Sequence, residues 1–296
     1  MVRASAEGQH RRRDEPGRGG AMTTQQQVRD AMQFVNEQDA ATVERFIERL
    51  ELRGKDPTFV AYREAYVDAM DLPPTARVVE VGCGTGVVSR AIASRDGFAG
   101  TVTGVDQSRD FIAVAQRLAA NEGVGDRVEF AVGDAHKLDL PSASFDAAIA
   151  HTLVSHVRDP LAVLKQMARV IRPDGIVAVF DGDYASLTFD CADRDLGKAV
   201  EGALEAMIMS SSRVMRELPR LLPQAGLRLL VTQANVYAEI GTSTFMLNLA
   251  ETYAPLIATQ GLLPAAQVDE WLAHQRRSAA DGTFFAACNY YAYLAR

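Results

Sequence analysis

The stretch VVEVGCGTG, residues 78–86, carries the clearest chemical signal in this 296-residue chain. Gly82, Gly84 and Gly86 alternate with other residues directly after a β-branched run. A dinucleotide-binding loop needs a further glycine at position 87, where this chain has valine. Glu80 lies inside the strand just before the loop, where a carboxylate repels a pyrophosphate but can receive a cationic amine. The loop therefore predicts a ligand with a positive group rather than a diphosphate.

Polar side chains near the ends of two later strands are candidates for handling a proton. His151 and His156 lie on either side of the run TLVS, and His151 ends a strand where it should face a cleft. Asp181, Asp183 and Tyr184 follow in FDGDYAS, after the next strand. The two carboxylates could orient an amine or hydroxyl acceptor or take its proton, or they could form a polar loop that caps the next helix. A backbone contact to a cofactor stays open for His151, as does a packing or capping role for His156. No third ligand at suitable spacing completes a metal site, so none is predicted.

Strands and helices that alternate along the middle of the chain should position these residues. Apolar runs predict strands at 77–82, 100–106, 127–135, 145–152 and 175–183. Helical spacing of apolar residues predicts helices at 86–95, 109–121 and 160–172. This alternation is typical of a doubly wound α/β fold with a mostly parallel sheet, in which ligands bind beyond the carboxyl ends of the strands.

The two ends of the chain are predicted to be largely helical. Residues 24–53 have helical spacing, and a second helix follows Pro57 and stops at the Pro-Pro pair 73–74. After the alternating part, the pattern predicts helix over 195–225, a sixth strand at 227–241, a helical block at 243–280 and a last strand at 283–296.

The combination of VVEVGCGTG with the later motifs resembles class I S-adenosylmethionine (SAM) dependent methyltransferases. The resemblance covers about residues 76–181 and continues more loosely to the C-terminus. It is closest to the branch that acts on quinones, sterols and natural products. It implies a seven-stranded sheet whose last strand inserts antiparallel beside the sixth. It also implies methyl transfer from SAM, with S-adenosyl-L-homocysteine as the product.

The resemblance also implies which residues hold the cofactor. Asp106 ends the second strand, where a carboxylate can accept hydrogen bonds from both ribose hydroxyls. Asp134 and the amide of Ala135, in GDAHKLDLP, resemble the pair that holds the adenine. The backbone of His151 is at the position that touches the methionine part. The implied cofactor-binding residues are Glu80, Gly82, Cys83, Gly84, Gly86, Asp106, Gln107, Asp134, Ala135 and His151.

We expect five segments. They are a disordered leader (1–22), after which Met22 is a candidate natural start, a helical cap (23–72), a SAM-binding core (73–240), a helical insertion (241–281) and the last core strand (282–296). The cap and the insertion are expected to form a lid over the acceptor. Its pocket is predicted to include Tyr62, Tyr66, Asp183 and Tyr184. Aromatic and Met residues of the insertion, such as Tyr253 and Trp271, fit a core role as well as a pocket role.

Composition narrows the class of partner. The net charge is −7, and no basic, aromatic-rich stripe typical of nucleic-acid binding occurs outside the leader. The three cysteines form no CxxC pair, which predicts a cytoplasmic chain with reduced thiols. No apolar run reaches the length of a membrane span. We therefore expect a small-molecule partner, with no nucleic acid and no membrane; a homodimer is left open.

The sequence thus predicts an enzyme that methylates a small organic acceptor. Methylation of RNA or protein is an alternative, although AHTL stands where base- and amide-methylating enzymes usually carry an Asn/Asp-Pro-Pro-aromatic motif. A SAM-binding protein without catalysis is a second alternative, but its loop would usually be degraded. Whether the acceptor atom is O, N, C or S stays open, as does the need for a protein base.

Overall fold

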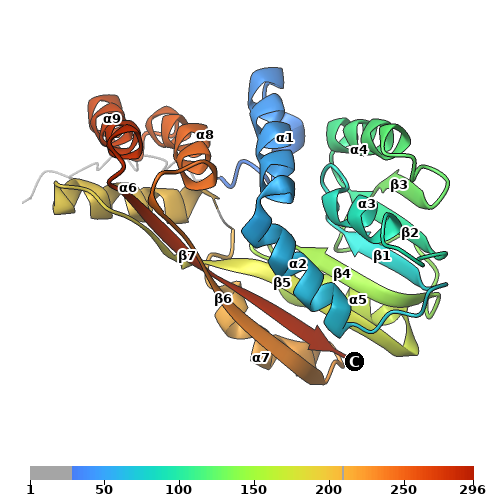
Figure 1. Ribbon diagram of the computed structural model, residues 1–296. Coiled ribbons are helices and arrows are strands. Elements are labelled where there is room, and N and C mark those ends of the chain that lie inside the picture. Colours follow the sequence, from blue (N-terminus) through green and yellow to red (C-terminus); the bar gives the residue numbers. More distant parts are fainter. Residues whose placement is uncertain (1–28, 209) are drawn as a thin grey trace, which may run out of the picture.

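The computed structural model describes residues 29–208 and 210–296, so the expected leader lies outside the described residues. One sheet forms the centre of the fold, with strand order β3-β2-β1-β4-β5-β7-β6 (Figure 1). Strands β1 to β5 pair in parallel, whereas β7 is antiparallel to both of its neighbours. The predicted seven-stranded sheet with an inserted last strand is confirmed. The strands are β1 (Arg77–Val81), β2 (Thr101–Asp106), β3 (Val128–Val132), β4 (Phe145–His151), β5 (Ile171–Phe189), β6 (Leu229–Gly241) and β7 (Phe284–Ala295).

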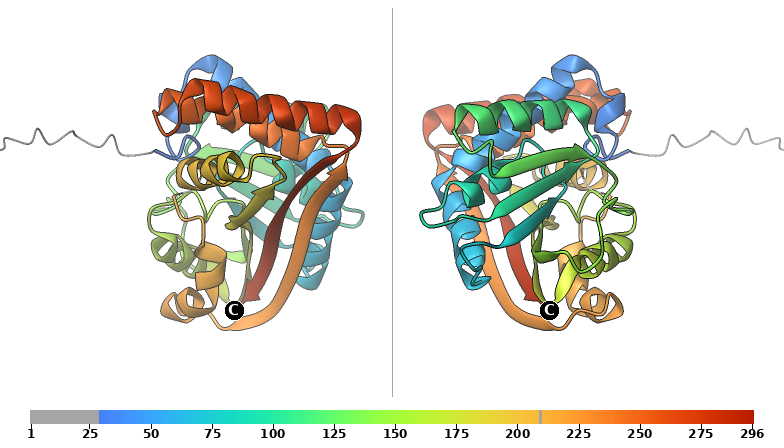
Figure 2. Two further views of the ribbon diagram at one scale, coloured as in Figure 1. Left: turned by 90° about the vertical axis from the view of Figure 1, so that its left-hand side faces the viewer. Right: turned by 90° about the vertical axis from the view of Figure 1, so that its right-hand side faces the viewer.

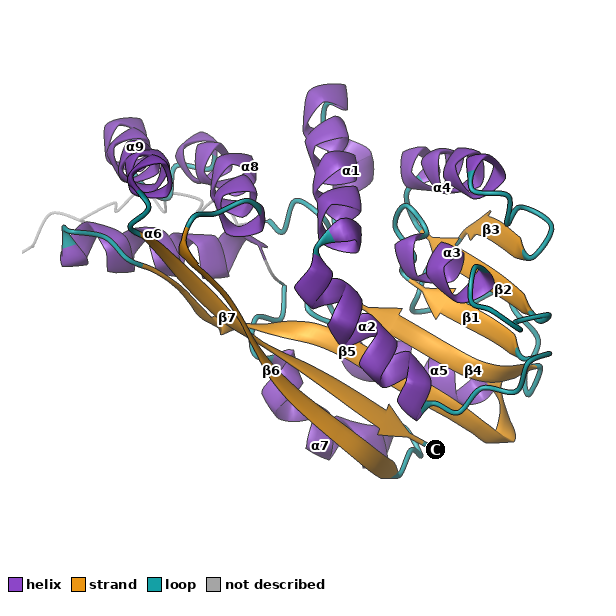
Figure 3. Cartoon of the chain, viewed as in Figure 1, coloured by secondary structure: helices purple, strands orange, loops and turns teal. Residues whose placement is uncertain are grey.

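Helices cover both faces of the sheet, as a doubly wound fold requires (Figure 3). α5 (Pro160–Val170) and α7 (Val214–Gln224) pack on one face, over a separate cluster of buried apolar side chains. The larger cluster lies under the helices of the other face. Figure 2 shows α4 and α9 at opposite ends of this helical layer. Its helices are α1 (Ala40–Lys55), α2 (Pro57–Ala69), α3 (Val87–Ala93), α4 (Arg109–Asn121), α6 (Arg194–Ile208), α8 (Phe245–Thr259) and α9 (Ala265–Asp281).

The N-terminal helix is shorter than the predicted 24–53. Helix α1 begins at Ala40 because Asp39 caps it, and the carboxylate of Asp39 accepts a hydrogen bond from the Thr42 amide at 2.9 Å. Residues 29–39 instead form turns and a short 3₁₀ helix, Val35–Glu37. Asp30 stabilises a turn there by accepting a hydrogen bond from the Met32 amide at 3.0 Å. We call residues 29–39 the N-terminal strap.

Strand β5 is longer than predicted and changes the setting of the two aspartates. It continues to Phe189 because it pairs with β7, with Asp181 opposite Tyr291 and Asp183 opposite Asn289. Both aspartates are therefore buried inside the sheet. The prediction of a polar loop at this point is wrong, since pairing with a strand more than a hundred residues away determines the conformation.

Candidate active site

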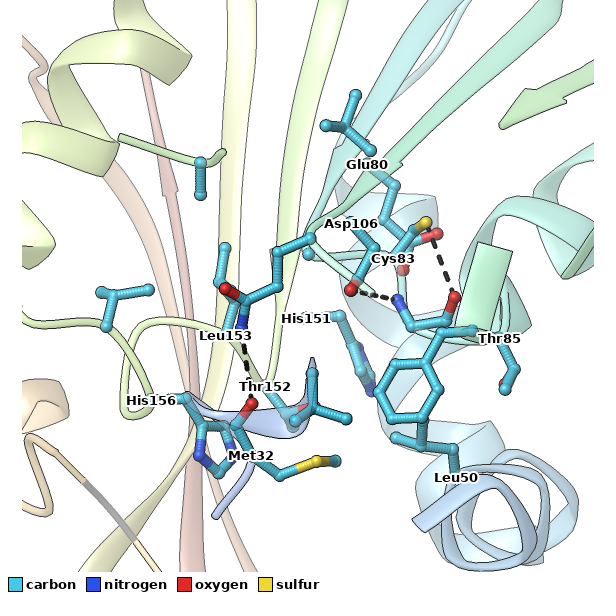
Figure 4. A pocket seen from close by; sticks show the side chains of 18 of the residues that line it. Met32, Leu50, Glu80, Cys83, Thr85, Asp106, His151, Thr152, Leu153 and His156 are labelled. Atoms are coloured by element: carbon cyan, nitrogen blue, oxygen red, sulfur yellow. Dashed lines mark hydrogen bonds between the residues drawn. The ribbon is translucent and has the colours of Figure 1, made fainter. Parts of the chain in front are cut away.

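A cavity of about 450 Å³ lies at the carboxyl ends of the central parallel strands, which is within the usual size of small-molecule sites. Its floor comes from the loops after β1, β2, β3 and β4, and its cover comes from α1 and the N-terminal strap. Figure 4 shows Glu80 and Asp106 at one end, His156 and Met32 at the other, and His151 between them. The cavity thus extends from the carboxylates of Glu80 and Asp106, past His151, to His156.

The glycine loop at the end of β1 depends on backbone conformations that favour glycine. Gly82, Gly84 and Gly86 have φ values of +70°, +52° and +77°. The amides of Gly82 and Cys83 donate to the Val105 carbonyl at 2.7 and 3.0 Å. A Cβ on Gly86 would lie 2.5 Å from the Phe130 ring, so that position also has no room for a larger residue. The loop is fixed before any ligand arrives.

Glu80, near the end of β1, provides the hydrogen-bond acceptor that the first turn of α3 lacks. Gly86 is the N-cap of α3 and has no side chain to satisfy the first-turn amides. The Glu80 carboxylate accepts a hydrogen bond from the Ser89 amide at 2.8 Å and another from the Ser89 hydroxyl. Burial raises the pKa of Glu80 to about 7, although the bonds from Ser89 oppose that shift. Glu80 also lines the cavity, so its charge responds both to pH and to a ligand.

Asp106 connects the end of β2 to the glycine loop. Its Oδ2 accepts from the Gly84 amide at 2.8 Å, and its Oδ1 accepts from the Ser108 amide at 2.9 Å. Burial raises the pKa of Asp106 against these hydrogen bonds. Asp134, on the next loop, is largely exposed and accepts from the His136 amide at 2.8 Å. Both aspartates line the cavity, so carboxylates surround this end of the site on three strands.

His151 is held neutral in the middle of the cavity. Burial, aided by the positive charges of Arg53 and Arg63, lowers the pKa of His151 well below its ordinary value. The Tyr66 hydroxyl lies 3.0 Å from Nδ1 of His151. Burial raises the pKa of Tyr66, so the tyrosine keeps its proton and donates a hydrogen bond to Nδ1. Phe180 stacks on the His151 ring at 4.7 Å between centroids. These contacts leave the ring orientation fixed.

His156 pairs with Asp30 of the N-terminal strap. Nδ1 of His156 lies 3.0 Å from the Asp30 carboxylate, whose side chain is 1% exposed. Burial alone would lower the pKa of His156, but Asp30, with a smaller effect from Asp181, outweighs it and raises the pKa. Asp181 itself accepts from the Ser155 amide at 3.0 Å and does not line the cavity. Asp30 and Asp181 therefore both raise the pKa of His156 at this end of the site.

Thr152 adopts a strained conformation beside the two histidines. It is β-branched yet has a φ of +54°, a region that is costly for such residues. Its amide donates to the Phe180 carbonyl at 2.6 Å, and its hydroxyl accepts from Nη2 of Arg53 at 2.6 Å. The strained residue of the cavity, Thr152, is thus also the one that binds Arg53 of α1.

The predicted site residues divide into those that meet at the cavity and those that do not. The implied cofactor-binding residues all line it except Gly86, and His156 lines it as well. Asp183 pairs with Arg216, with Nε–Oδ distances of 2.8 and 2.9 Å, and is not part of the lining. The Tyr62 hydroxyl donates to the Val236 carbonyl at 2.9 Å. Neither Tyr62 nor Tyr66 nor Tyr184 lines the cavity, and Tyr253 and Trp271 are buried core residues outside it.

Sequence reasoning missed Asp30 and the strap as parts of the site. The predicted long helix obscured the strap, and no local pattern connects Asp30 to a histidine 126 residues away. Among the described residues, no group of three or more His, Cys, Asp or Glu side chains is arranged to hold a metal ion. None of the described helices is long and apolar enough to span a bilayer.

We expect Glu80 to make folding stability depend on pH. Its pKa is raised from 4.5 to about 7 in the folded chain, so its stabilising contribution is complete below pH 4.5 and is lost as pH rises through 7. Glu80→Gln keeps an acceptor for Ser89 and removes the charge. Relative to wild type, this variant should gain up to about 3 kcal/mol between pH 5 and pH 8, measured by urea unfolding.

The exposed Glu129 of strand β3, in the same sheet, provides the control, since Glu129→Gln should show no such gain. An equal stability difference between Glu80→Gln and wild type at both pH values would contradict the role assigned to burial.

Comparisons with known proteins agree with this geometry. Residues 73–252 match the family model described as "Methyltransferase domain". An uncharacterized 37.1 kDa protein in transposon TN4556 of Streptomyces fradiae is 30% identical over 80% of this chain and 67% of its own length. Methyltransferase GfsG of Streptomyces halstedii is 33% identical over 56% of this chain and 58% of its own length.

A solved structure shows the same fold. The [4+2]-cyclase SpnF superposes with a TM-score of 0.54, at 24% identity, over 80% of this chain and 81% of that one. Because that protein is named as a cyclase, the fold alone does not determine the reaction. The matched segment covers more than half of this chain and contains the glycine loop, Asp106 and the three histidines that line the cavity. The chain therefore belongs to the methyltransferase domain family, with the seven-stranded class I architecture.

Proposed function

We propose that this protein transfers the methyl group of SAM to a small organic acceptor and releases S-adenosyl-L-homocysteine. The observation that carries the proposal is the polarity of the cavity, with carboxylates at one end and histidines at the other (Figure 4). SAM carries a sulfonium and an ammonium, which carboxylates at short range attract strongly in a partly desolvated site. The histidine end is then left for the acceptor.

The cofactor assignment follows the order of the loops. We assign the ribose hydroxyls to Asp106, the adenine to Asp134 and the Ala135 amide, and the methionine part to the glycine loop with Glu80 and His151. Support comes from the fact that these residues come from four strands and line one cavity. Gln107 also holds the strap over the cofactor end of the cavity, because its Nε2 donates a hydrogen bond to the Gln33 carbonyl at 2.9 Å.

Methyl transfer from a sulfonium is an in-line displacement, so the protein mainly aligns the acceptor and excludes water. The strap helps to exclude water. Nδ2 of Asn36 donates to the Gln107 carbonyl at 3.0 Å, which closes the edge of the cavity. A base is needed only where the acceptor must lose a proton. For that role we assign His156, with Asp30 and Asp181 as positioning residues, while neutral His151 orients its neighbours.

The experiment that tests this function uses SAM labelled on its methyl group. The protein is incubated with a cell extract, and the small-molecule, RNA and protein fractions are counted separately. Label in the small-molecule fraction is expected. Label in RNA or protein would overturn the acceptor class, and SAM binding without transfer to any fraction would favour a protein that binds the cofactor without methylating.

Asp106→Ala is expected to weaken binding of S-adenosyl-L-homocysteine by about 1–3 kcal/mol, the usual cost of losing hydrogen bonds to a charged group. Calorimetric titration measures the change. Asp110→Ala, on the exposed face of the first turn of α4, is the matched control and should leave the affinity as in wild type. Unchanged affinity in Asp106→Ala would remove the ribose assignment.

Asp30→Asn is expected to lower the pKa of the His156 imidazole, because the Asp30 carboxylate stabilises the protonated ring. An NMR titration of the histidine ring protons measures this without an acceptor. In wild type, His156 should titrate above the ordinary value of about 6.5, whereas His151 should stay neutral to well below it. If the substitution left the His156 titration in place, the strap would have no part in setting its charge.

A further inference from the structure

Helix α1 presents two arginines, one turn apart, that have no carboxylate partner within residues 29–208 and 210–296. Arg49 forms no ion pair there and its Nη1 has no hydrogen-bond partner, while the Arg53 side chain donates to the uncharged Thr152 hydroxyl. Arg90 of the adjoining α3 shows the usual arrangement, because it pairs with both Glu51 and Glu122. Exposed arginines need no acid, but Arg49 and Arg90 are the buried arginines of the described residues, and Arg49 has no carboxylate partner. A buried guanidinium without a counterion is costly and calls for a ligand.

Arg49 is the more deeply buried of the two. Its side chain is 6% exposed, and Nη1 has no hydrogen-bond partner in the described part of the chain. The guanidinium lies over the Phe245 ring at 4.3 Å from its centroid, which offsets part of the cost of burial. Burial lowers the pKa of Arg49, yet a guanidinium stays protonated at neutral pH. A positive charge is therefore held in the interior without a counterion.

Arg53, one turn after Arg49, places a second positive charge at the cavity wall. It lines the wall beside His151, and the strained Thr152 holds one of its nitrogens at 2.6 Å. Behind it, the Tyr290 hydroxyl is fully buried and has no partner among the described residues. Burial raises the pKa of Tyr290, and both Arg53 and Arg49 act against that rise, so the three polar groups are electrostatically coupled.

Apolar surface adjoins these charges. Phe59 lines the cavity and packs on Phe245 at 4.8 Å and on Tyr290 at 5.0 Å between centroids. Charge thus varies along the cavity: carboxylates surround the end assigned to SAM, whereas Arg53 and the Phe59 ring line the wall beside His151, with Arg49 behind. An acceptor complementary to that wall is an anion with an apolar body.

We propose that the methyl acceptor carries a carboxylate or phosphate group, bound by Arg53 with Arg49 behind it, on an aromatic or apolar body that packs against Phe59. This inference rests on the proposed function, since it assigns the acceptor half of the same cavity. The acceptor's anion would supply the counterion that the two arginines lack.

The test uses protein saturated with S-adenosyl-L-homocysteine and three probes of similar shape: benzoate, phenyl phosphate and the neutral benzamide. Calorimetric titration should show at least one anion binding roughly ten- to a hundredfold more tightly than benzamide, as expected for charge-assisted hydrogen bonds. Preference for benzoate would assign a carboxylate, and preference for phenyl phosphate would assign a phosphate. Equal binding of benzamide and both anions would overturn the inference.

Substitutions on α1 locate the effect. Arg53→Gln should remove the preference for anions, while Arg53→Lys should retain part of it because the charge stays. Arg45→Gln is the matched control, since Arg45 is exposed one turn before Arg49. Arg49→Met should weaken the anion preference several-fold and raise the thermal midpoint of the ligand-free protein, because it removes an uncompensated buried charge. A lower midpoint with unchanged preference would make Arg49 structural and contradict the proposal.

The two proposals fail in different ways. If S-adenosyl-L-homocysteine does not bind at all, the proposed function fails. If it binds normally and the anions are not preferred, the cofactor assignment stands and only the acidic acceptor is excluded.

Discussion

The hydrogen bonds that fix the glycine loop against the end of β2 determine how the rest of the site is built. Three residues in left-handed conformations cannot form a regular strand or helix, so their amides need acceptors from elsewhere. Val105 and Asp106 supply them for Gly82 and Gly84, while the Gly86 amide donates to the Cys83 carbonyl within the loop. Glu80 satisfies the start of α3 that the glycine N-cap leaves open. The same carboxylates that stabilise the loop also face the cavity. Loop stability and attraction for a cation are therefore two effects of one arrangement.

Separation of charge along the cavity follows from which elements contribute each end. The strand ends contribute acids, while α1 contributes arginines and the strap contributes Asp30, which pairs with His156. Because the interior screens charges weakly, this separation would orient the proposed cationic cofactor and anionic acceptor relative to each other before any chemistry. The strap closes the cofactor end and also raises the pKa of His156, so one segment links exclusion of water to the state of the proposed base.

Local sequence patterns predicted the elements that carry the cofactor loops and failed where distant contacts decide. The strand before the glycine loop and the helix Arg109–Asn121 agree with prediction because apolar periodicity and flanking turn residues act within a few positions. The strap was missed because capping by Asp39 overrides the helical spacing before it. The alternative of a polar loop at Asp181 and Asp183 fails because pairing with β7 extends β5. An arginine without a partner cannot be recognised in a sequence, since the missing acid is a property of the packed chain.

The most direct test of this account is a crystal structure of the protein with S-adenosyl-L-homocysteine. We predict that the ribose hydroxyls lie within hydrogen-bond distance of Asp106 and the adenine beside Asp134. The sulfur should point toward His156 and Arg53, leaving the arginine end open for the acceptor. A cofactor bound in the reverse direction, with its sulfur away from Arg53, or bound outside this cavity, would contradict the account.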